Sequence, residues 1–341
     1  MSTPAIRRAT IAHVAARAGV DRSVVSRVLS GDPRLNVRDE TRARVLDAVR
    51  ELDYRPNAIA RSLRTQRAEA FGLSIPDFAN PIYAEVITGA AAAAAARDCL
   101  LLATSEAQMR RPEQYVDLLE QSRIDGLLLA GTVARPKMLA RLSETRRAWL
   151  LINRRVRGSR RWIVLDDEQA AFMAVEHLAS LGHERIAHLA GPPEADTAQR
   201  RLRGYRRALT EHDLAEQEAL VVRSDYSAEG GARAMAELIR ARPRPTAVFA
   251  ANVAAAIGAL AAAREAGVDV PGRLSVIAVH DTPLAGYLTP PLTTLRMPLE
   301  ELGRRAIAVL ADLAPDTEVQ EVLGGRIELI PRASTGPVPA R

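Results

Sequence analysis

One stretch of the chain carries side chains suited to contact DNA bases. In residues 21–29, DRSVVSRVL, apolar residues recur at helical spacing and polar residues occupy the opposite face. An arginine at the N-terminal end of a helix suits the major groove, where it can make two hydrogen bonds to guanine, and a valine there can contact a thymine methyl group. The alternative is the solvated face of a small helical hairpin. The candidate DNA-contacting residues of this helix are Arg22, Ser23, Val24, Ser26 and Arg27.

The residues just before this helix predict a partner that holds it in place. Thr10 can cap a first helix, Gly19 permits a tight turn, and Asp21 can cap the helix that follows. The valines of the second helix would then face the first. The pattern predicts two short helices joined by a turn within residues 10–30, and Thr10 also counts among the candidate DNA-binding residues.

The net charge of the chain is concentrated at its N-terminal end. The 341 residues have a formal net charge of +6, and residues 1–70 hold 14 arginines and 8 acidic residues, whereas the remainder holds 33 of each sign. A small basic module ahead of a neutral body is typical of nucleic-acid binders. A basic tail without a partner is the alternative.

From residue 71 to about residue 330, short apolar runs alternate with helical stretches. Runs such as LLLATS, IDGLLLAG and LSVIAVHD are typical of buried parallel strands. The alternation predicts an α/β body with parallel sheets, and its length favours two sub-domains. We expect the alanine tract at 90–96 to form a close-packing helix face. The expected helices cover residues 81–97, 168–181, 199–212, 228–241, 253–266 and 298–313.

Polar residues at the ends of the predicted strands are candidates for a ligand pocket. In parallel sheets, ligands bind beyond the carboxyl ends of the strands. For each residue taken singly, a turn or a helix cap is the alternative. The candidates are Asp77, Asn153, Asp225, Asn252, His280 and Asp281.

Motifs for catalysis, cofactors or metals are not found in the sequence. Phosphate-binding loops, dinucleotide-binding glycine motifs and nucleophile elbows do not occur. The histidines of HERIAH, residues 183–188, would lie on different faces of a helix, so we expect a helix end that leads into a strand. Cys99 is the single cysteine, and no apolar run is long enough to span a membrane. The chain is therefore predicted to be cytoplasmic, without a cofactor or metal, and not an enzyme.

Several stretches together resemble the lac repressor family of bacterial transcription regulators. TIAHVAARAGVDRSVVSRVL and ETRARVLDAVRELDYRPNAIARSL resemble the family's N-terminal headpiece, and NPIYAEVITGA, LASLGHERIAHLAGP and LTPPLTTLRMP resemble its effector domain. The resemblance implies a homodimer that binds a roughly palindromic operator, with a small-molecule effector between two lobes that the chain crosses three times. The absence of leucine heptads after residue 333 favours a dimer over a tetramer.

The resemblance also implies a hinge helix in YRPNAIARSL, residues 54–63. In this helix Leu63 would be an apolar wedge in the minor groove, and neighbouring arginines would contact phosphates. A plain basic linker is the alternative. The candidate hinge contacts are Arg55, Asn57, Ala58, Arg61 and Leu63.

The expected domain boundaries follow from this resemblance. The headpiece covers 1–55, the hinge helix and linker 56–68, and the effector-binding and dimerisation domain 69–333, with a flexible tail at 334–341. Within the effector domain, lobe 1 is expected at about 69–163 and 291–321, and lobe 2 at about 164–290 and 322–333.

The pocket positions that match the family are Tyr83, Asn153, Arg201, Tyr226 and Asn252. Three positions depart from it. His13 stands where the family usually has aspartate, Val253 replaces the aspartate after Asn252, and His280 replaces an aspartate that contacts effectors in many members.

A neutral imidazole offers one donor and one acceptor in place of a carboxylate, so His280 is also a candidate effector contact and the usual sugar contact is in doubt. Arg201 and His280, together with Arg154, would favour an anionic effector. An ordinary sugar, with Arg154 pointing to solvent, is the alternative.

These features predict an effector-responsive, DNA-binding transcriptional regulator, most simply a repressor. A solute-binding receptor with the same lobes and no DNA role is one alternative. A sugar-modifying enzyme is another, although no nucleophile or metal constellation supports it. Repressor and activator cannot be told apart from the protein sequence.

Overall fold

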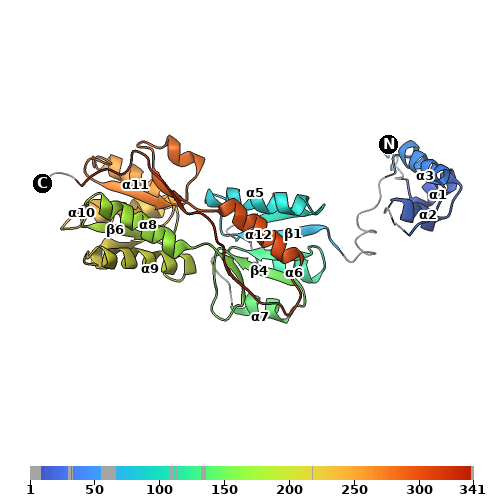
Figure 1. Cartoon of the computed structure of the whole chain (residues 1–341), viewed down its shortest axis with the longest axis horizontal. Helices are drawn as coiled ribbons and strands as arrows, with labels where there is room; N and C mark the ends of the chain where they lie inside the picture. The colour runs from blue at the N-terminus through green and yellow to red at the C-terminus, as the bar shows by residue number, and fades with distance from the viewer. Residues whose placement is uncertain are drawn as a thin grey trace, which may run out of the picture. The chain divides into compact units, whose positions relative to one another are not determined.

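The computed structural model of the chain describes residues 9–29, 32, 34–54, 67–106, 111, 114–131, 136–216 and 218–338. The chain divides into two compact units, Met1–Arg67 and Ala68–Arg341 (Figure 1). Within the described residues, no helix is both long and apolar enough to cross a membrane.

The described residues of the N-terminal unit form three helices, α1 (Ile11–Ala18), α2 (Arg22–Leu29) and α3 (Asp39–Glu51). Gly19 ends α1 in the left-handed conformation, with φ of 65°, which a glycine adopts at little cost. Asp21 precedes α2, and its carboxylate accepts a hydrogen bond from the Ser23 N–H at 2.8 Å. The predicted helix pair and its turn are therefore confirmed. The buried core of the unit consists of Val14, Ala15, Ala18, Val25, Val28, Val45 and Ala48.

His13, the first departure from the family, takes part in the start of α1. Its Nδ1 atom accepts a hydrogen bond from the Thr10 backbone N–H at 3.2 Å. Such a bond satisfies one of the amides that a helix start leaves without a partner. The imidazole thus fills an acceptor role at the helix start that a carboxylate could also fill.

The second unit contains two six-stranded sheets, each with helices packed on it (Figure 1). All strand pairs are parallel except β10 with β12. In spatial order, the first sheet, which defines lobe 1, consists of β11 (Val319–Val322), β5 (Arg161–Val164), β4 (Ala148–Ile152), β3 (Gly126–Leu129), β1 (Ala70–Ile75) and β2 (Leu100–Ser105). In spatial order, the second sheet, which defines lobe 2, consists of β12 (Glu328–Ile330), β10 (Thr293–Arg296), β9 (Ser275–Val279), β8 (Ala247–Ala250), β6 (Ile186–Ala190) and β7 (Val221–Arg223).

The helices of each lobe cover its own sheet. Lobe 1 carries α5 (Ile82–Ala95), α6 (Gln114–Glu120), α7 (Pro136–Glu144) and α12 (Leu299–Ala311). Lobe 2 carries α8 (Asp167–Ser180), α9 (Asp196–Glu211), α10 (Ala228–Arg240) and α11 (Val253–Glu265), with short 3₁₀ helices η2 (Glu218–Leu220) and η3 (Pro283–Tyr287). The expected parallel α/β body and its six long helices are confirmed. HERIAH spans the end of a helix–strand loop and the start of β6, also as predicted.

Two of the expected boundaries are wrong. Strand β10 pairs with β9 and β12, so residues 293–296 belong to lobe 2, and the chain returns to lobe 1 after Arg296 rather than at residue 291. The segment predicted as a flexible tail is also packed as far as residue 338: Ser334 is fully buried and its hydroxyl accepts from the Thr293 N–H at 2.8 Å. Pairing partners distant in sequence decide both features. The three predicted crossings between lobes are present.

Small residues allow the helices of each lobe to approach closely. A Cβ atom on Gly89 of α5 would lie 1.8 Å from the Glu300 carbonyl oxygen of α12, and one on Gly258 of α11 would lie 1.7 Å from the Ala228 carbonyl oxygen of α10. Ala90, Ala93 and Ala94 are buried on α5. The alanine tract therefore forms a close-packing helix face, as predicted.

The close approach of α10 and α11 leads to a stability prediction. Gly258→Val should lower the free energy of unfolding by about 1–3 kcal/mol, because the new side chain must push two helix backbones apart. Urea denaturation measures this change. Ala261→Val places the same side chain at a half-buried position of α11 and should cost less than about 1 kcal/mol. Equal losses in the two variants would contradict the prediction.

Candidate DNA-binding face and effector cavity

The polar face of α2 is accessible in the headpiece. Arg22 and Ser23 are exposed at the N-terminal end of the helix, and Val24 and Ser26 are half-buried beside them. The exposed Arg27 donates from Nε to the Asp32 carboxylate at 3.0 Å and from Nη2 to the Arg34 carbonyl oxygen at 3.2 Å. The structure thus brings the candidate residues of α2 together, with Arg22, Ser23 and Arg27 exposed and Arg27 bonded to the loop that follows.

Of the remaining DNA-binding candidates, Thr10 is among the described residues and the hinge residues are not. Thr10 is exposed at the N-terminus of α1. The hinge candidates lie outside the described residues, and their roles stay predictions. They are Arg55, Asn57, Ala58, Arg61 and Leu63.

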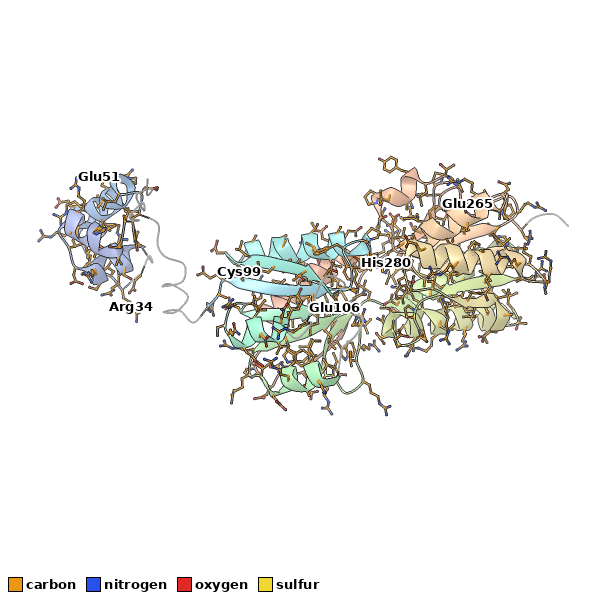
Figure 2. All side chains as sticks on the ribbon, turned by 180° about the vertical axis from the view of Figure 1, so that it is seen from behind. Arg34, Glu51, Cys99, Glu106, Glu265 and His280 are labelled. Atoms are coloured by element: carbon orange, nitrogen blue, oxygen red, sulfur yellow. The ribbon has the colours of Figure 1, made fainter. Side chains whose placement is uncertain are left out.

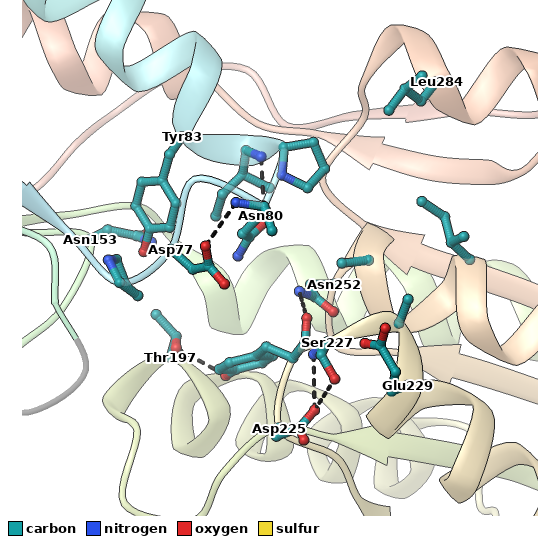
Figure 3. Close-up of a pocket in the computed structure, with 18 of the residues that line it drawn as sticks. Asp77, Asn80, Tyr83, Asn153, Thr197, Asp225, Ser227, Glu229, Asn252 and Leu284 are labelled. Carbon is teal, nitrogen blue, oxygen red and sulfur yellow. Dashed lines mark hydrogen bonds between the residues drawn. The ribbon is translucent and has the colours of Figure 1, made fainter. Parts of the chain in front are cut away.

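A cavity of about 620 Å³ lies between the two lobes of the second unit (Figure 3). Its walls include the loops that follow β1, β4, β7 and β8, so it opens at the carboxyl ends of the strands, as predicted. The polar and aromatic lining residues are Asp77, Asn80, Tyr83, Asn153, Arg154, Thr197, Arg201, Asp225, Tyr226, Ser227, Glu229 and Asn252.

The inner part of the cavity wall is polar and buried. Asn153 is 3% exposed, and its buried Oδ1 atom has no hydrogen-bond partner among the described residues. The Thr197 hydroxyl lies 3.0 Å from the Tyr226 hydroxyl, and Asn252 donates to the Tyr226 carbonyl oxygen at 2.9 Å (Figure 3). Asn252 also caps α11 by accepting from the Ala255 N–H at 2.9 Å. Asn153 Oδ1 is therefore an acceptor that a ligand can satisfy.

A buried ion cluster lies behind this wall. Asp167 is fully buried, and Arg200 and Arg201 are each 3% exposed. Arg201 donates from Nε to the Asp167 carboxylate at 2.8 Å, and Arg200 pairs with both Asp167 and Asp196. Burial alone would raise the pKa of Asp167, but the two guanidinium groups outweigh it and hold that pKa below its ordinary value. The cluster thus balances two buried cations with two carboxylates.

The same cluster joins the lobes. Arg200 donates from Nη2 to the Asn153 carbonyl oxygen at 3.3 Å, and the Asp196 carboxylate accepts from the Arg155 N–H at 2.9 Å. Asn153 and Arg155 follow β4 of lobe 1, whereas Arg200 and Asp196 belong to α9 of lobe 2. Sequence reasoning missed Asp167, Asp196 and Arg200; the paired arginines in RRLRGYRRAL are a signal for them, but their partners come from distant segments.

His280 lies in this cluster and is not among the residues that line the cavity. It is fully buried at the end of lobe 2 that faces lobe 1 (Figure 2), and its Nε2 atom accepts from Arg201 Nη2 at 2.8 Å. Burial, with a smaller contribution from Arg201, lowers the pKa of His280 to about 3 despite the nearby Asp167. The ring is therefore neutral, and its hydrogen is on Nδ1, because a guanidinium cannot accept.

The structure thus corrects two predictions about pocket residues. His280 supports Arg201 from behind rather than facing the cavity. Asp281 also lies outside the cavity lining: its carboxylate accepts from the Thr294 hydroxyl at 2.7 Å and from Arg296 and Arg332 at 2.8 Å. The other pocket candidates, Asp77, Asn153, Asp225 and Asn252, all line the cavity, as do Tyr83, Arg201 and Tyr226. Position at a strand end does not by itself say which way a side chain points.

A helix-turn-helix unit followed by two α/β lobes around a cavity defines a DNA-binding regulator that responds to a small molecule. Comparison with known families supports this class. Residues 10–57 match the model described as "Bacterial regulatory proteins, lacI family", and residues 175–335 match a "Periplasmic binding protein-like domain". The chain belongs to the lacI family of bacterial regulatory proteins.

Individual relatives agree over nearly the whole length. The transcriptional repressor PurR of Pectobacterium carotovorum subsp. carotovorum is 34% identical over 308 residues, which cover 89% of this chain and 90% of PurR. The repressor CytR of Escherichia coli K12 is 33% identical, and the match covers 97% of each chain. Both relatives are named as transcriptional repressors.

Solved structures show the same fold. The lac repressor dimer bound to operator and the anti-inducer ONPF is 26% identical with a TM-score of 0.85, and the match covers 97% of this chain and all of that one. A complex of the transcriptional regulator CelR with cellobiose is 30% identical with a TM-score of 0.71, covering 96% of this chain and all of that chain. The chain is therefore a DNA-binding transcriptional regulator of the repressor type, modulated by a small molecule.

Proposed function

We propose that this chain is a homodimeric repressor that reads its operator with Arg22 and Ser23 and binds its effector in the cavity between lobes 1 and 2. The observation that carries the proposal is the cavity itself, which is lined from both lobes and retains the buried, unsatisfied Asn153 Oδ1. A ligand held by both lobes favours one arrangement of them over another. Because such differential affinity shifts the population of arrangements, effector binding changes operator affinity.

An exposed sheet edge supports the dimer. Strand β2 lies at the edge of the first sheet, and Leu100 and Leu102 on it are 69% and 45% exposed. An apolar edge strand of this kind is usually covered by another chain or element, since it would otherwise pair with unintended partners. In the lac repressor structure the protein is a dimer on its operator. A second copy of this chain is the partner that we propose for this edge, and the regulator would act in the cytoplasm, where the chromosome lies.

Arg22 provides the test of DNA reading. Arg22→Ala should weaken binding to operator DNA by about 1–3 kcal/mol, because a guanidinium contact to a base edge is lost. The operator is sought in the intergenic DNA upstream of the gene that encodes this chain. Gel shifts measure this with the operator and with the operator changed at one half-site position. The variant should lose discrimination at one position in each half-site.

The control removes the same charge elsewhere in the headpiece. Arg44 is exposed on α3, and Arg44→Ala should weaken binding to both DNAs alike. If Arg22→Ala keeps the wild-type ratio between the two DNAs, Arg22 does not read bases. If the wild-type chain shows no preference for upstream DNA over unrelated DNA of equal length, the proposed function itself is wrong.

A further inference from the structure

Arg154 is a buried cation on the cavity wall that has no counter-ion among the described residues. Its side chain is 5% exposed and lines the cavity, and its Nε donates to the Ala130 carbonyl oxygen at 2.9 Å. It takes part in no ion pair among the described residues. The structure therefore excludes the alternative in which Arg154 points to solvent.

Arg201, the other cavity arginine, is in a different situation. It is paired with Asp167, and it also donates to the Ala251 carbonyl oxygen at 2.5 Å and to His280 at 2.8 Å. Its charge is thus balanced by Asp167, and most of its N–H groups already donate hydrogen bonds to other residues of the protein. The neutral His280 adds no positive charge. Of the three groups expected to attract an anion, Arg154 alone retains an unbalanced charge in the described part of the cavity.

Three acidic residues line the cavity, and none of the ion pairs among the described residues joins them to Arg154. Asp77, Asp225 and Glu229 are exposed, and Asp225 is already paired with Arg233 at 3.0 Å. Figure 3 shows Asn153, Tyr83 and Asp77 at one side of the cavity, with Asp225 and Glu229 at the other. The residue next to Arg154 in the chain, Asn153, offers the unsatisfied acceptor. Two consecutive buried residues of the cavity wall therefore offer a ligand a cation, Arg154, and a hydrogen-bond acceptor, Asn153 Oδ1.

A buried guanidinium without a counter-ion is costly, because water no longer solvates it and no carboxylate replaces the water. A binding site can retain such a charge when the ligand brings the missing anion. We infer that the effector is a small molecule with a carboxylate or phosphate group that Arg154 receives, and a hydroxyl or amine group that donates to Asn153 Oδ1. This inference rests on the proposed function, since it names the chemical class of effector for the same cavity.

Simple anions probe this subsite without knowledge of the effector. We would measure the thermal unfolding of the full chain in inorganic phosphate and in acetate, each against chloride at equal ionic strength. With a dissociation constant of about 1 mM, 10 mM of the preferred anion should raise Tm by roughly 2–4 °C. A rise in phosphate alone indicates a phosphorylated effector, and a rise in acetate alone indicates a carboxylic acid.

Substitutions then assign the rise to Arg154. Arg154→Gln should lose it and Arg154→Lys should retain part of it, because lysine keeps the charge but not the planar fork. Arg157→Gln is the matched control, since Arg157 is exposed in the same loop and does not line the cavity, and it should show the full rise. No rise in the wild-type chain with either anion, or the full rise in Arg154→Gln, would overturn the inference.

We would also measure the affinity of the same wild-type and Arg157→Gln samples for operator DNA. This measurement distinguishes a wrong effector class from a wrong proposed function. Operator binding without an anion-induced rise in Tm means that only the effector class is wrong. An anion-induced rise in a chain that does not bind upstream DNA means that the anion subsite exists but the proposed function is wrong.

Discussion

Asp167→Asn should lower the free energy of unfolding of the second unit by about 3–5 kcal/mol, the usual cost of removing one partner from a buried ion pair. Asp167 is fully buried and is the carboxylate that Arg200 and Arg201 share. In the variant, Arg200 keeps Asp196, but Arg201 keeps only its carbonyl and imidazole partners. The large cost comes from the buried charge left behind rather than from the bond itself.

Urea denaturation at pH 7 measures the loss, and Asp166→Asn is the matched control. Asp166 is exposed and accepts from the Gln169 N–H at 3.0 Å as the cap of α8. Asparagine caps a helix about as well as aspartate, so this control should cost less than about 1 kcal/mol. Similar urea midpoints for the wild type and Asp167→Asn would show that the cluster does not hold the lobes together as the structure indicates.

The pH dependence of Asp167 provides a second readout. Because its folded pKa is held below the ordinary value of about 3.9, its stabilisation is present above that value. The stabilisation is lost as pH falls through the lower, folded pKa. The stability difference between the wild type and Asp167→Asn should therefore shrink in strong acid.

Acidification from pH 7 to pH 5 should lower the free energy of unfolding of the second unit by about 4 kcal/mol through two buried histidines. Burial lowers the pKa of His188 to about 4 and that of His280 to about 3. In the unfolded chain each has a pKa of about 6.5. Below that value the unfolded chain binds protons that the folded chain excludes, so stability falls with pH. Each histidine contributes about 2 kcal/mol by pH 5.

His188 can be tested separately. It stacks between Phe249 and Tyr205, with ring centroids 4.6 and 5.2 Å away, and its Nδ1 lies 3.0 Å from the Phe249 carbonyl oxygen. His188→Phe should make the loss between pH 7 and pH 5 smaller by about 2 kcal/mol, whatever its effect on stability at pH 7. The exposed His212, changed to asparagine, should leave the pH dependence as it is. Urea denaturation at the two pH values decides, and an unchanged loss in His188→Phe would contradict the prediction.

The neutral state of His280 also bears on effector recognition. Where the resemblance to the family implies a carboxylate, this chain has an uncharged ring, which accepts from Arg201 and stays behind it. The position therefore neither repels an anion nor attracts one. This leaves recognition of an anionic group to Arg154, as inferred above.

Local patterns predicted the headpiece well because its interactions are local. Asp21 bonds to Ser23, Gly19 closes the turn next to α1, and α2 buries Val25 and Val28 against the helix pair. Helical spacing is enough to sort these residues into a buried face and an exposed face. The same holds for the long helices and parallel strands of the lobes, whose apolar runs are continuous.

The errors arose where the partner lies far away in sequence. Ser334 looked like part of a frayed tail, yet it bonds to Thr293 and to Val276 in the second sheet. The expected lobe boundary places β10 in lobe 1, but β10 pairs with β9 and β12 of lobe 2, and these pairings are visible only in the folded chain. Asp167 and Arg200 are ordinary charged residues in the sequence and form an ion pair only after two segments of lobe 2 meet.

The sequence by itself determined the helix pair, the α/β lobes, the family and most of the polar and aromatic residues that line the cavity, because spacing and strand ends record which face of an element is buried. The tertiary structure alone decided which polar residues face the cavity and which are paired behind it. His280 looks like a ligand-binding residue in the sequence, but it bonds to Arg201, whose charge is paired with Asp167. Arg154 looks like a residue that could point to solvent, but it is buried, and it has no counter-ion in the described part of the chain. The physical reason is that charge balance and hydrogen-bond satisfaction depend on neighbours in space, and a linear pattern does not contain them.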